Sequence, residues 1–430
     1  MPAGHALDEV WRTHWGRLLG QLMHRFGRPD LVEDALAGAF ADASAQWPAS
    51  GVPDNPAGWI RTVASRRVVD ALRREHTARA KAHLLADAES TQDALPDGTG
   101  VVPGEDVDER LPLLFMATHP VLAPEVRPAL ALRFVLGVPT ADVARLFLVP
   151  TATMAARLTR AKARLASSGV PFVVPDLDRW PERLDDVART IYLAFTAAYA
   201  PVGGEDVVLV ERAGDAVRLA ELTTELLPGR PALEALAALL VLQHARRDAR
   251  SGPDGRLVRL VDQDRDRWHL DEIDAGLRRL RALVPGAGLA EELRLQALVA
   301  AFHDTAPTSA ATDWAAIALT YARLESLTGS PVVRLNRAVA VGEAAGPMAG
   351  LAVLRAVADQ LPHHHRLALV RAELLRRDGQ AHPALAAYDE ALAECPDGPE
   401  RRHILDQRES LAASASDRPP TERGRPGPPV

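Results

Sequence analysis

Cationic side chains gather between Pro150 and Leu165, a stretch with no acidic residue. At about 100° per residue, a helix here carries its guanidinium groups on one face, opposite an apolar stripe of Met154, Leu158, Ala161 and Leu165. Guanidinium groups bind phosphates and guanine edges, and threonine hydroxyls contact either. The pattern therefore indicates a nucleic-acid-binding helix, although it also fits a solvated face on a structural helix. The predicted DNA contacts are Thr151, Thr153, Arg157, Arg160, Lys162 and Arg164.

A second basic helix is predicted upstream, from Gly58 to Glu75. Its apolar face would carry Ile60, Ala64, Val68, Ala71 and Leu72. A tryptophan ring beside guanidinium groups suits separated DNA strands, because the ring stacks on an unpaired base while the cations bind phosphates. Trp59 equally fits a packing role at the start of the helix. The predicted contacts to melted DNA are Trp59, Arg61, Arg66, Arg67, Arg73 and Arg74.

The composition indicates a globular all-α protein. Hydrophobic residues make up 47% of the 430 residues and charged residues 25%, which is typical of folded domains. Aromatic residues make up only 4%, and no long run of alternating β-branched residues occurs. The length predicts two or three domains. The net charge of -7 argues against indiscriminate nucleic-acid binding but not against local basic patches.

Cysteine usage and hydropathy indicate in which cellular compartment the protein is expected. A single cysteine, Cys395, cannot form an internal disulfide and suits a reducing cytoplasm. No stretch reaches the ~18 uninterrupted apolar residues that a membrane span needs. The N-terminal residues lack the pattern of a secretory signal. We therefore expect a cytoplasmic protein that makes no membrane contact.

A shorter helical pattern precedes the downstream basic helix. Its apolar residues Val143, Ala144, Leu146 and Phe147 can pack against that helix, across a short turn near residues 147–149. Two helices joined in this way form a helix-turn-helix, whose second helix enters the major groove of DNA.

Residues 111–165 resemble region 4 of the extracytoplasmic-function sigma factors, small σ70-type subunits of bacterial RNA polymerase. The motif that carries the resemblance, VPTATMAARLTRAK, runs from Val149 to Lys162. The resemblance implies that this helix reads the −35 promoter element.

Residues 29–48 and 55–75 are similar to sigma region 2. This resemblance implies that the second stretch helps to recognise and open the −10 element. It also implies that the first helix docks on the β′ clamp helices of core polymerase, and the docking residues would be Leu31, Val32, Asp34, Leu36 and Phe40. Where members often carry a polar pair, this chain has Ala37-Gly38.

The remaining chain resembles a sigma subgroup with a long tetratricopeptide-like helical extension, thought to govern activity in place of an anti-sigma protein. Leu335 and Leu369 illustrate a weak similarity at a spacing of 34 residues, the tetratricopeptide period. Chance similarity between helical hairpins rich in alanine and leucine is the alternative. The predicted segments are region 2 (1–82), a flexible acidic linker (83–109), region 4 (110–168), the C-terminal helical regulatory domain (176–410) and a disordered tail (411–430).

We expect no catalytic residue, no cofactor and no metal, since the polymerase would supply the chemistry. Asp262, Asp264 and Asp266 have the spacing of the first three ligands in a calcium-binding loop. The position that must be glycine in such a loop is Arg267, so no calcium site is expected. Cys395 has no partner nearby in the sequence and is expected to be inert. The expected partners are core RNA polymerase, double-stranded and melted promoter DNA, and an intramolecular or protein ligand of the C-terminal domain. A freestanding helix-turn-helix regulator and a helical repeat scaffold are the alternative functions.

Overall fold

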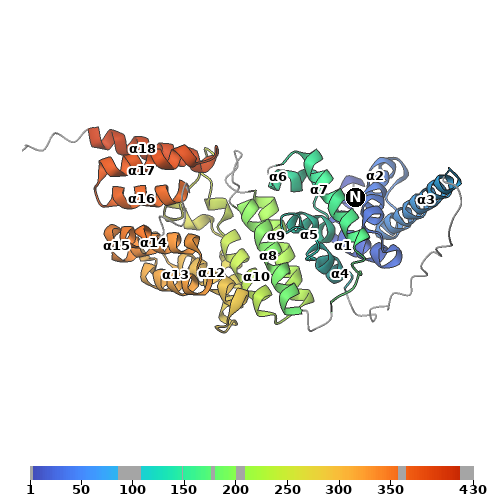
Figure 1. Cartoon of the computed structure of the whole chain (residues 1–430), viewed down its shortest axis with the longest axis horizontal. Helices are drawn as coiled ribbons and strands as arrows, with labels where there is room; N and C mark the ends of the chain where they lie inside the picture. The colour runs from blue at the N-terminus through green and yellow to red at the C-terminus, as the bar shows by residue number, and fades with distance from the viewer. Residues whose placement is uncertain are drawn as a thin grey trace, which may run out of the picture. The chain divides into compact units, whose positions relative to one another are not determined.

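The computed structural model of the chain (Figure 1) describes residues 3–85, 108–147, 149–175, 180–199, 209–356 and 365–416. Within these ranges the regular structure is helical, without strands, so the predicted all-α class is confirmed. None of the described helices is long and apolar enough to cross a membrane. Two compact units are described separately below: unit 1 comprises Met1–Ala198 and Glu211–Leu233, and unit 2 comprises Tyr199–Val210 and Glu234–Val430.

Unit 1 begins with three mutually packed helices, α1 (Ala3–Phe26), α2 (Pro29–Ser50) and α3 (Pro56–Leu85). The predicted apolar face of α3 is inside, and Ile60, Ala64 and Val68 are fully buried. Arg28 joins the first turn of α2 to the body of α3, because its guanidinium group pairs with Asp30 at 2.6 Å and with Glu75 at 3.1 Å. The three helices therefore form a bundle with one arginine-rich outer side.

Four shorter helices follow in unit 1: α4 (Arg110–Ala117), α5 (Arg127–Leu136), α6 (Thr140–Leu146) and α7 (Thr151–Ser167). Helix α6 packs against α7 in the predicted helix-turn-helix. Gly137 ends α5 with φ of 69°, and a Cβ atom there would lie 2.5 Å from the Cγ atom of Trp15. Only glycine combines this backbone conformation with so close an approach of the α1 ring.

Two further helices, α8 (Trp180–Tyr199) and α9 (Val210–Leu226), lie largely in unit 1. Asp186 on α8 accepts a 3.0 Å hydrogen bond from Arg127 on α5, and Arg212 on α9 pairs with Asp142 on α6 at 3.1 Å. The division of the chain thus differs from the domain boundary predicted near residue 176. Half-buried ion pairs hold the first helices of the extension to the helix-turn-helix block, and periodicity along the chain does not reveal such pairs.

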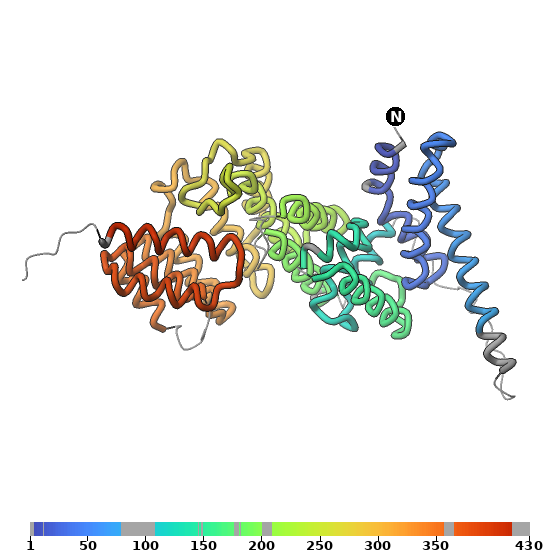
Figure 2. Tube along the Cα trace, turned by 90° about the horizontal axis from the view of Figure 1, so that it is seen from above, coloured from blue at the N-terminus to red at the C-terminus, as the bar shows by residue number. Residues whose placement is uncertain are grey.

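Unit 2 holds the rest of the described chain. Its α-helices are α10 (Pro231–His244, whose first turn lies in unit 1), α11 (Leu270–Arg281), α12 (Gly288–Thr305), α13 (Trp314–Thr328), α14 (Pro331–Ala345), α15 (Pro347–Arg355), α16 (His365–Arg377), α17 (Ala381–Glu394) and α18 (Pro399–Ser416). Its 3₁₀ turns are η2 (Arg247–Ala249), η3 (Leu260–Asp262), η4 (Arg265–Arg267) and η5 (Ser309–Ala311). From α12 to α18 each helix packs against the next, and the last three lie side by side in Figure 2.

Two successive hairpins of unit 2 share one period. Pro331 and His365, which begin α14 and α16, are 34 residues apart, as are Pro347 and Ala381, which begin α15 and α17. Both pairs of helices are tightly packed. The weak similarity in the sequence therefore corresponds to a repeated helix-turn-helix unit of the same length.

Two of the predicted segments fall largely outside the described residues. The acidic linker predicted over 83–109 begins within α3, and the described chain resumes at Asp108 just before α4. The tail predicted from residue 411 starts later than expected, because α18 continues to Ser416. Residues 417–430 lie outside the described ranges.

Candidate nucleic-acid interface

Helix α7 separates an apolar face from a basic face, as its sequence predicts. Met154, Leu158, Ala161 and Leu165 are buried. The side chains of Arg157, Arg160 and Arg164 are exposed on the other side, together with Thr151 and Thr153. Within the described ranges no ion pair involves these three arginines. Their guanidinium groups are therefore available to phosphates or base edges.

Lys162 departs from the predicted set of exposed DNA contacts. Its side chain is only 7% exposed, and its Nζ atom lies 2.9 Å from Glu33 Oε2 and 2.6 Å from Asp34 Oδ1. Lys162 follows Ala161 on the inner side of α7, facing α2. Two carboxylates therefore hold Lys162 inside unit 1, so in this arrangement it is separate from the exposed side chains with which it was predicted to contact DNA.

Glu33 is the centre of this buried network. Its Oε1 atom accepts a 2.6 Å hydrogen bond from Arg133 Nε on α5, while its Oε2 atom accepts from Lys162 on α7. The Arg133 guanidinium also lies 4.6 Å from the centre of the Trp15 ring on α1. Trp15 in turn donates its indole N–H to the Arg133 carbonyl oxygen at 3.0 Å. Helices from both predicted sigma regions therefore meet around one carboxylate.

The charges of the network stabilise one another despite their burial. Burial acts to raise the pKa of Glu33, but Arg133 and Lys162 outweigh it and hold that pKa below its usual value. Burial acts to lower the pKa of Lys162, and Glu33 and Asp34 raise it overall. Opposite charges within hydrogen-bond distance favour the ionised form of each partner. The shifts of both pKa values therefore favour the charged forms of Glu33 and Lys162 near neutral pH.

The arginines predicted on α3 are exposed and divide into two groups. Arg61, Arg66 and Arg73 line a groove against α1, with a cavity volume of about 830 Å³. Arg25, at the end of α1, lines the same groove and was not predicted. A single arginine in the last turn of α1 gives no pattern in the sequence, so only the fold reveals its place. The acidic Asp70 and Glu109 also line this groove.

Arg67 and Trp59 lie differently from the groove arginines. Arg67 donates to both carboxylate oxygens of Asp42 on α2, at 2.7 and 3.0 Å. Trp59 is half-buried and meets Trp47 of α2 edge-on, with ring centres 5.7 Å apart. This is the packing role that the sequence left open for Trp59. Arg74 is exposed and donates to the Asp70 carbonyl oxygen of its own helix at 3.2 Å.

Most residues predicted to dock on polymerase are inside unit 1. Val32, Leu36 and Phe40 are at most 2% exposed. Phe40 packs edge-on against Trp11 of α1, with ring centres 4.6 Å apart. In this arrangement these three side chains do not lie on an open docking surface, because the apolar face of α2 forms the core of its own bundle.

The two remaining docking residues lie at the surface of α2. Leu31 is half-buried and Asp34 is exposed.

Steric crowding explains why α2 carries a glycine, Gly38, where related proteins often carry a polar residue. A Cβ atom on Gly38 would lie 2.8 Å from an Nη atom of Arg67. Arg67 crosses the helix at this point to reach Asp42, one turn further along α2. The departure from the usual polar pair thus accommodates an internal ion pair.

Comparison with known proteins places these observations in a family. Residues 113–165, which span most of α4–α7, match the sigma-70 region 4 family. Residues 183–284 match a family of unknown function, DUF6596. No solved structure shows a significant match.

A curated relative covers almost the whole chain. It is the uncharacterized protein R00370 of Rhizobium meliloti (strain 1021), 38% identical over 405 residues, which are 92% of this chain and 93% of that protein. Identity at this level over nearly both full lengths establishes common family membership. The chain therefore belongs to the family of R00370 and is, by its region 4 domain, a sigma-70 family member.

Proposed function

We propose that the chain is an alternative sigma factor of the extracytoplasmic-function type. It directs core RNA polymerase to promoters and catalyses no reaction itself. The observation that carries this proposal is the exposed row of Arg157, Arg160 and Arg164 on α7, within the segment that matches sigma-70 region 4. A major-groove helix needs such a row, since arginine binds guanine edges and phosphates. In this reading α7 contacts the −35 element.

The groove between α1 and α3 suits the second promoter element. Arg61, Arg66 and Arg73 on one wall and Arg25 on the other supply cations along this groove. A positively charged groove that follows the backbone is the usual way to bind a single strand. We assign the groove to the displaced strand of the −10 region, where its cations neutralise phosphates.

Polymerase binding requires a change within unit 1. Asp34, on the exposed side of α2, is held by Lys162 of α7 at 2.6 Å. A docking helix and a DNA-reading helix that are tied together cannot each engage a separate target. We infer that the described arrangement is a closed form, and that separation of α7 from α2 exposes the docking side of α2 to the β′ clamp helices.

Unit 2 is proposed to control this opening in the cytoplasm, where the polymerase and the chromosome are. Its hairpins α14–α15 and α16–α17 repeat at 34 residues, as in tetratricopeptide arrays, which bind peptides or other domains. The ligand of unit 2 would be another part of this chain or a separate protein.

The direct test is transcription in vitro with purified core polymerase. The full chain should co-purify with the core enzyme and produce a promoter-dependent transcript. The triple variant Arg157→Ala/Arg160→Ala/Arg164→Ala should abolish this transcript while co-purification persists. A matched triple variant at exposed arginines of unit 2, Arg278→Ala/Arg281→Ala/Arg355→Ala, should leave transcription unchanged.

A freestanding helix-turn-helix regulator is the second candidate. The burial of Val32, Leu36 and Phe40 favours it, because it leaves α2 with a small docking surface. In that case the chain would bind its DNA site without co-purifying with core polymerase. Specific DNA binding without any association with polymerase would overturn the sigma-factor proposal.

The regulatory role of unit 2 needs its own comparison. A chain that ends after Leu233 keeps the whole of unit 1, including α8 and α9, whose ion pairs hold α5 and α6. Its circular dichroism would first establish that it folds. Its transcript yield should then differ from that of the full chain, whereas equal yields would exclude control by unit 2.

A further inference from the structure

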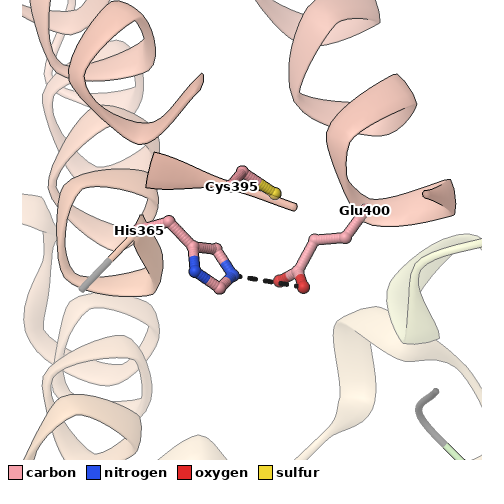
Figure 3. A group of neighbouring side chains, drawn as sticks. All are labelled: His365, Cys395 and Glu400. Carbon is pink, nitrogen blue, oxygen red and sulfur yellow. Dashed lines mark hydrogen bonds and ion pairs between the residues drawn. The ribbon is translucent and has the colours of Figure 1, made fainter. Parts of the chain in front are cut away.

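Three side chains that can ligate a metal meet at one end of the last helices of unit 2. His365 is the first residue of α16, Cys395 directly follows α17, and Glu400 lies in the first turn of α18. One ligand atom from each lies within 4.8 Å of the other two. Figure 3 shows the imidazole ring facing the Glu400 carboxylate, with the thiol beside them. Within the described ranges this is the one place where three such atoms converge.

The packing of the three helices positions each ligand. Ala372, Tyr388 and Ile404 form the core that holds α16, α17 and α18 together. The Cys395 side chain packs at the edge of this core and is 6% exposed. Its sulfur makes a weak 3.6 Å contact to the Pro396 carbonyl oxygen. The thiol is therefore fixed in place without a strong hydrogen bond.

The side chains of the other two ligands, His365 and Glu400, already contact each other. His365 Nε2 lies 3.3 Å from Glu400 Oε2, and Arg366 donates to both oxygens of the same carboxylate, at 3.1 and 3.3 Å. Because a carboxylate has two oxygens, Arg366 can keep one oxygen while the other binds a metal. An arginine on a metal-ligating carboxylate fixes its orientation, as outer hydrogen bonds commonly do in metal sites.

We propose that His365, Cys395 and Glu400 bind a Zn²⁺ ion, with a water molecule in the fourth position. One nitrogen, one sulfur and one carboxylate oxygen are all ligands that Zn²⁺ accepts, at about 2.0–2.3 Å each. Four ligands at these lengths are about 3.5 Å apart, so small side-chain rotations bring the three atoms into range. The thiolate disfavours Mg²⁺ and Ca²⁺, and the carboxylate disfavours Cu⁺.

Zinc binding changes the protonation of one group. Burial, and then the Glu400 carboxylate, raise the pKa of the Cys395 thiol, so the thiol holds its proton in the metal-free protein. Formation of the sulfur–zinc bond transfers that proton to water, and the sulfur binds as a thiolate. The bound ion then ties the start of α16, the end of α17 and the start of α18 together. This site does not depend on DNA binding by unit 1.

The chain has one cysteine, which makes the test specific. The full chain, purified without a histidine tag and stripped with a chelator, is titrated with Co²⁺ as a spectroscopic probe for zinc. One equivalent of Co²⁺ should produce a thiolate-to-cobalt charge-transfer band in the near ultraviolet together with tetrahedral d–d bands. Stoichiometric Zn²⁺ should then abolish both, because zinc binds such sites more tightly.

Variants identify the ligands. Cys395→Ser should lose the charge-transfer band, and His365→Gln and Glu400→Gln should each weaken zinc binding more than about 100-fold, beyond the loss typical of outer-sphere changes. The controls are His382→Gln and Glu409→Gln, exposed residues of α17 and α18, which should bind zinc like the unmodified chain. Circular dichroism of each variant would establish that the helices are retained.

A second measurement avoids substitution altogether. Zinc at saturating concentration should slow alkylation of the Cys395 thiol in the unmodified full chain by more than tenfold. Absence of the charge-transfer band, unchanged alkylation in the presence of zinc, or equal loss of binding in the control variants would each overturn the proposal.

Discussion

Lys162 Nζ lies 2.9 Å from Glu33 Oε2, although the two residues are 129 positions apart in the chain. Each side chain is only 7% exposed. The contact joins α7, the helix with the exposed arginines, to α2, and Arg133 of α5 completes it. A buried charge that loses its partner costs far more than a surface ion pair contributes. The closed form of unit 1 therefore depends on this pair.

Replacement of Lys162 tests whether the stability of unit 1 depends on this pair. Lys162→Met should destabilise unit 1 by about 3–5 kcal/mol, because Glu33 is left buried with one partner fewer. Urea unfolding of the full chain, followed through tryptophan fluorescence, measures the change, because five of the seven tryptophans lie in unit 1. Arg160→Ala, an exposed position on the same helix, should change stability by less than about 0.5 kcal/mol.

The double variant Glu33→Gln/Lys162→Met distinguishes charge from packing. Its amide oxygen at position 33 can still accept from Arg133, so no buried carboxylate is left without a cation. Asp34 also loses Lys162, but its side chain is 70% exposed and stays hydrated. It should therefore be more stable than Lys162→Met alone. A double variant as unstable as the single one would mean that side-chain packing, and not the buried charge, controls the closed form.

Arg157 should read a base if α7 lies in the major groove. Arg157→Ala should then weaken binding to the specific promoter by about 1–3 kcal/mol and relax the preference at one base pair. Binding titrations with sets of single-base variants measure both effects. Arg278→Ala on α11 is the matched control and should bind DNA normally. An equal loss on all sequences would make Arg157 a phosphate contact.

The groove arginines should govern the salt dependence of single-strand binding. The triple variant Arg61→Gln/Arg66→Gln/Arg73→Gln should reduce the slope of log affinity against log salt by about 2, at roughly 0.7 per lost phosphate contact. Titration of a fluorescent single strand at several salt concentrations measures the slope.

Arg67→Gln provides the control for this experiment within the same helix. Its guanidinium group is engaged by Asp42 and does not line the groove. The slope should therefore stay the same in this variant. A reduction equal to one third of that of the triple variant would show that Arg67 leaves Asp42 to bind DNA, contrary to our assignment.

The faces of the helices could be predicted from the sequence, because they follow from local periodicity. The buried stripe of α7 at Met154, Leu158 and Ala161 and that of α3 at Ile60 and Ala64 depend only on the helical repeat. The exposed arginines lie opposite for the same reason. The turn between α6 and α7 was likewise predictable from its position between two apolar patterns.

Long-range pairings could not be predicted, since no local pattern records them. Lys162 looks like any other cation of its helix until α2 brings Glu33 beside it. Cys395 likewise lacks a partner in the sequence, and the fold places His365 and Glu400 next to it. The burial of Leu36, a docking residue carried over by resemblance, could not be predicted either, because the resemblance does not say which side of a helix is free.

Acid should weaken unit 2 through His303. Burial, and then the charges of Arg246 and Arg265, lower the pKa of His303 from 6.5 to about 4 in the folded chain. The unfolded chain takes up a proton near pH 6.5, so this group contributes stability above pH 6.5 that is lost as the pH falls toward 4. The loss amounts to at most about 3 kcal/mol.

The substitution His303→Gln isolates this contribution. The neighbouring Asp304 acts in the opposite direction, because burial raises its pKa to about 6 and its contribution grows as the pH falls. Unfolding of both chains between pH 4 and 7 should show a shallower dependence for His303→Gln, whereas the exposed control His382→Gln should follow the unmodified chain. Identical slopes for all three would exclude His303 as the titrating group.

Close approach of α14 and α15 should make Gly350 intolerant of any side chain. A Cβ atom at this position would lie 2.7 Å from the Ala338 carbonyl oxygen and 3.0 Å from the Cα atom of Gly342. Both neighbours are backbone atoms that cannot move aside alone. Gly350→Ala should therefore destabilise unit 2 by about 1–3 kcal/mol, although alanine favours the helix itself by up to about 1 kcal/mol. Gly286→Ala, where the added methyl group meets open space, should stay within about 0.5 kcal/mol in the same urea titration. Equal stability of the two variants would mean that the hairpin can spread, and that the repeat is not held by this glycine contact.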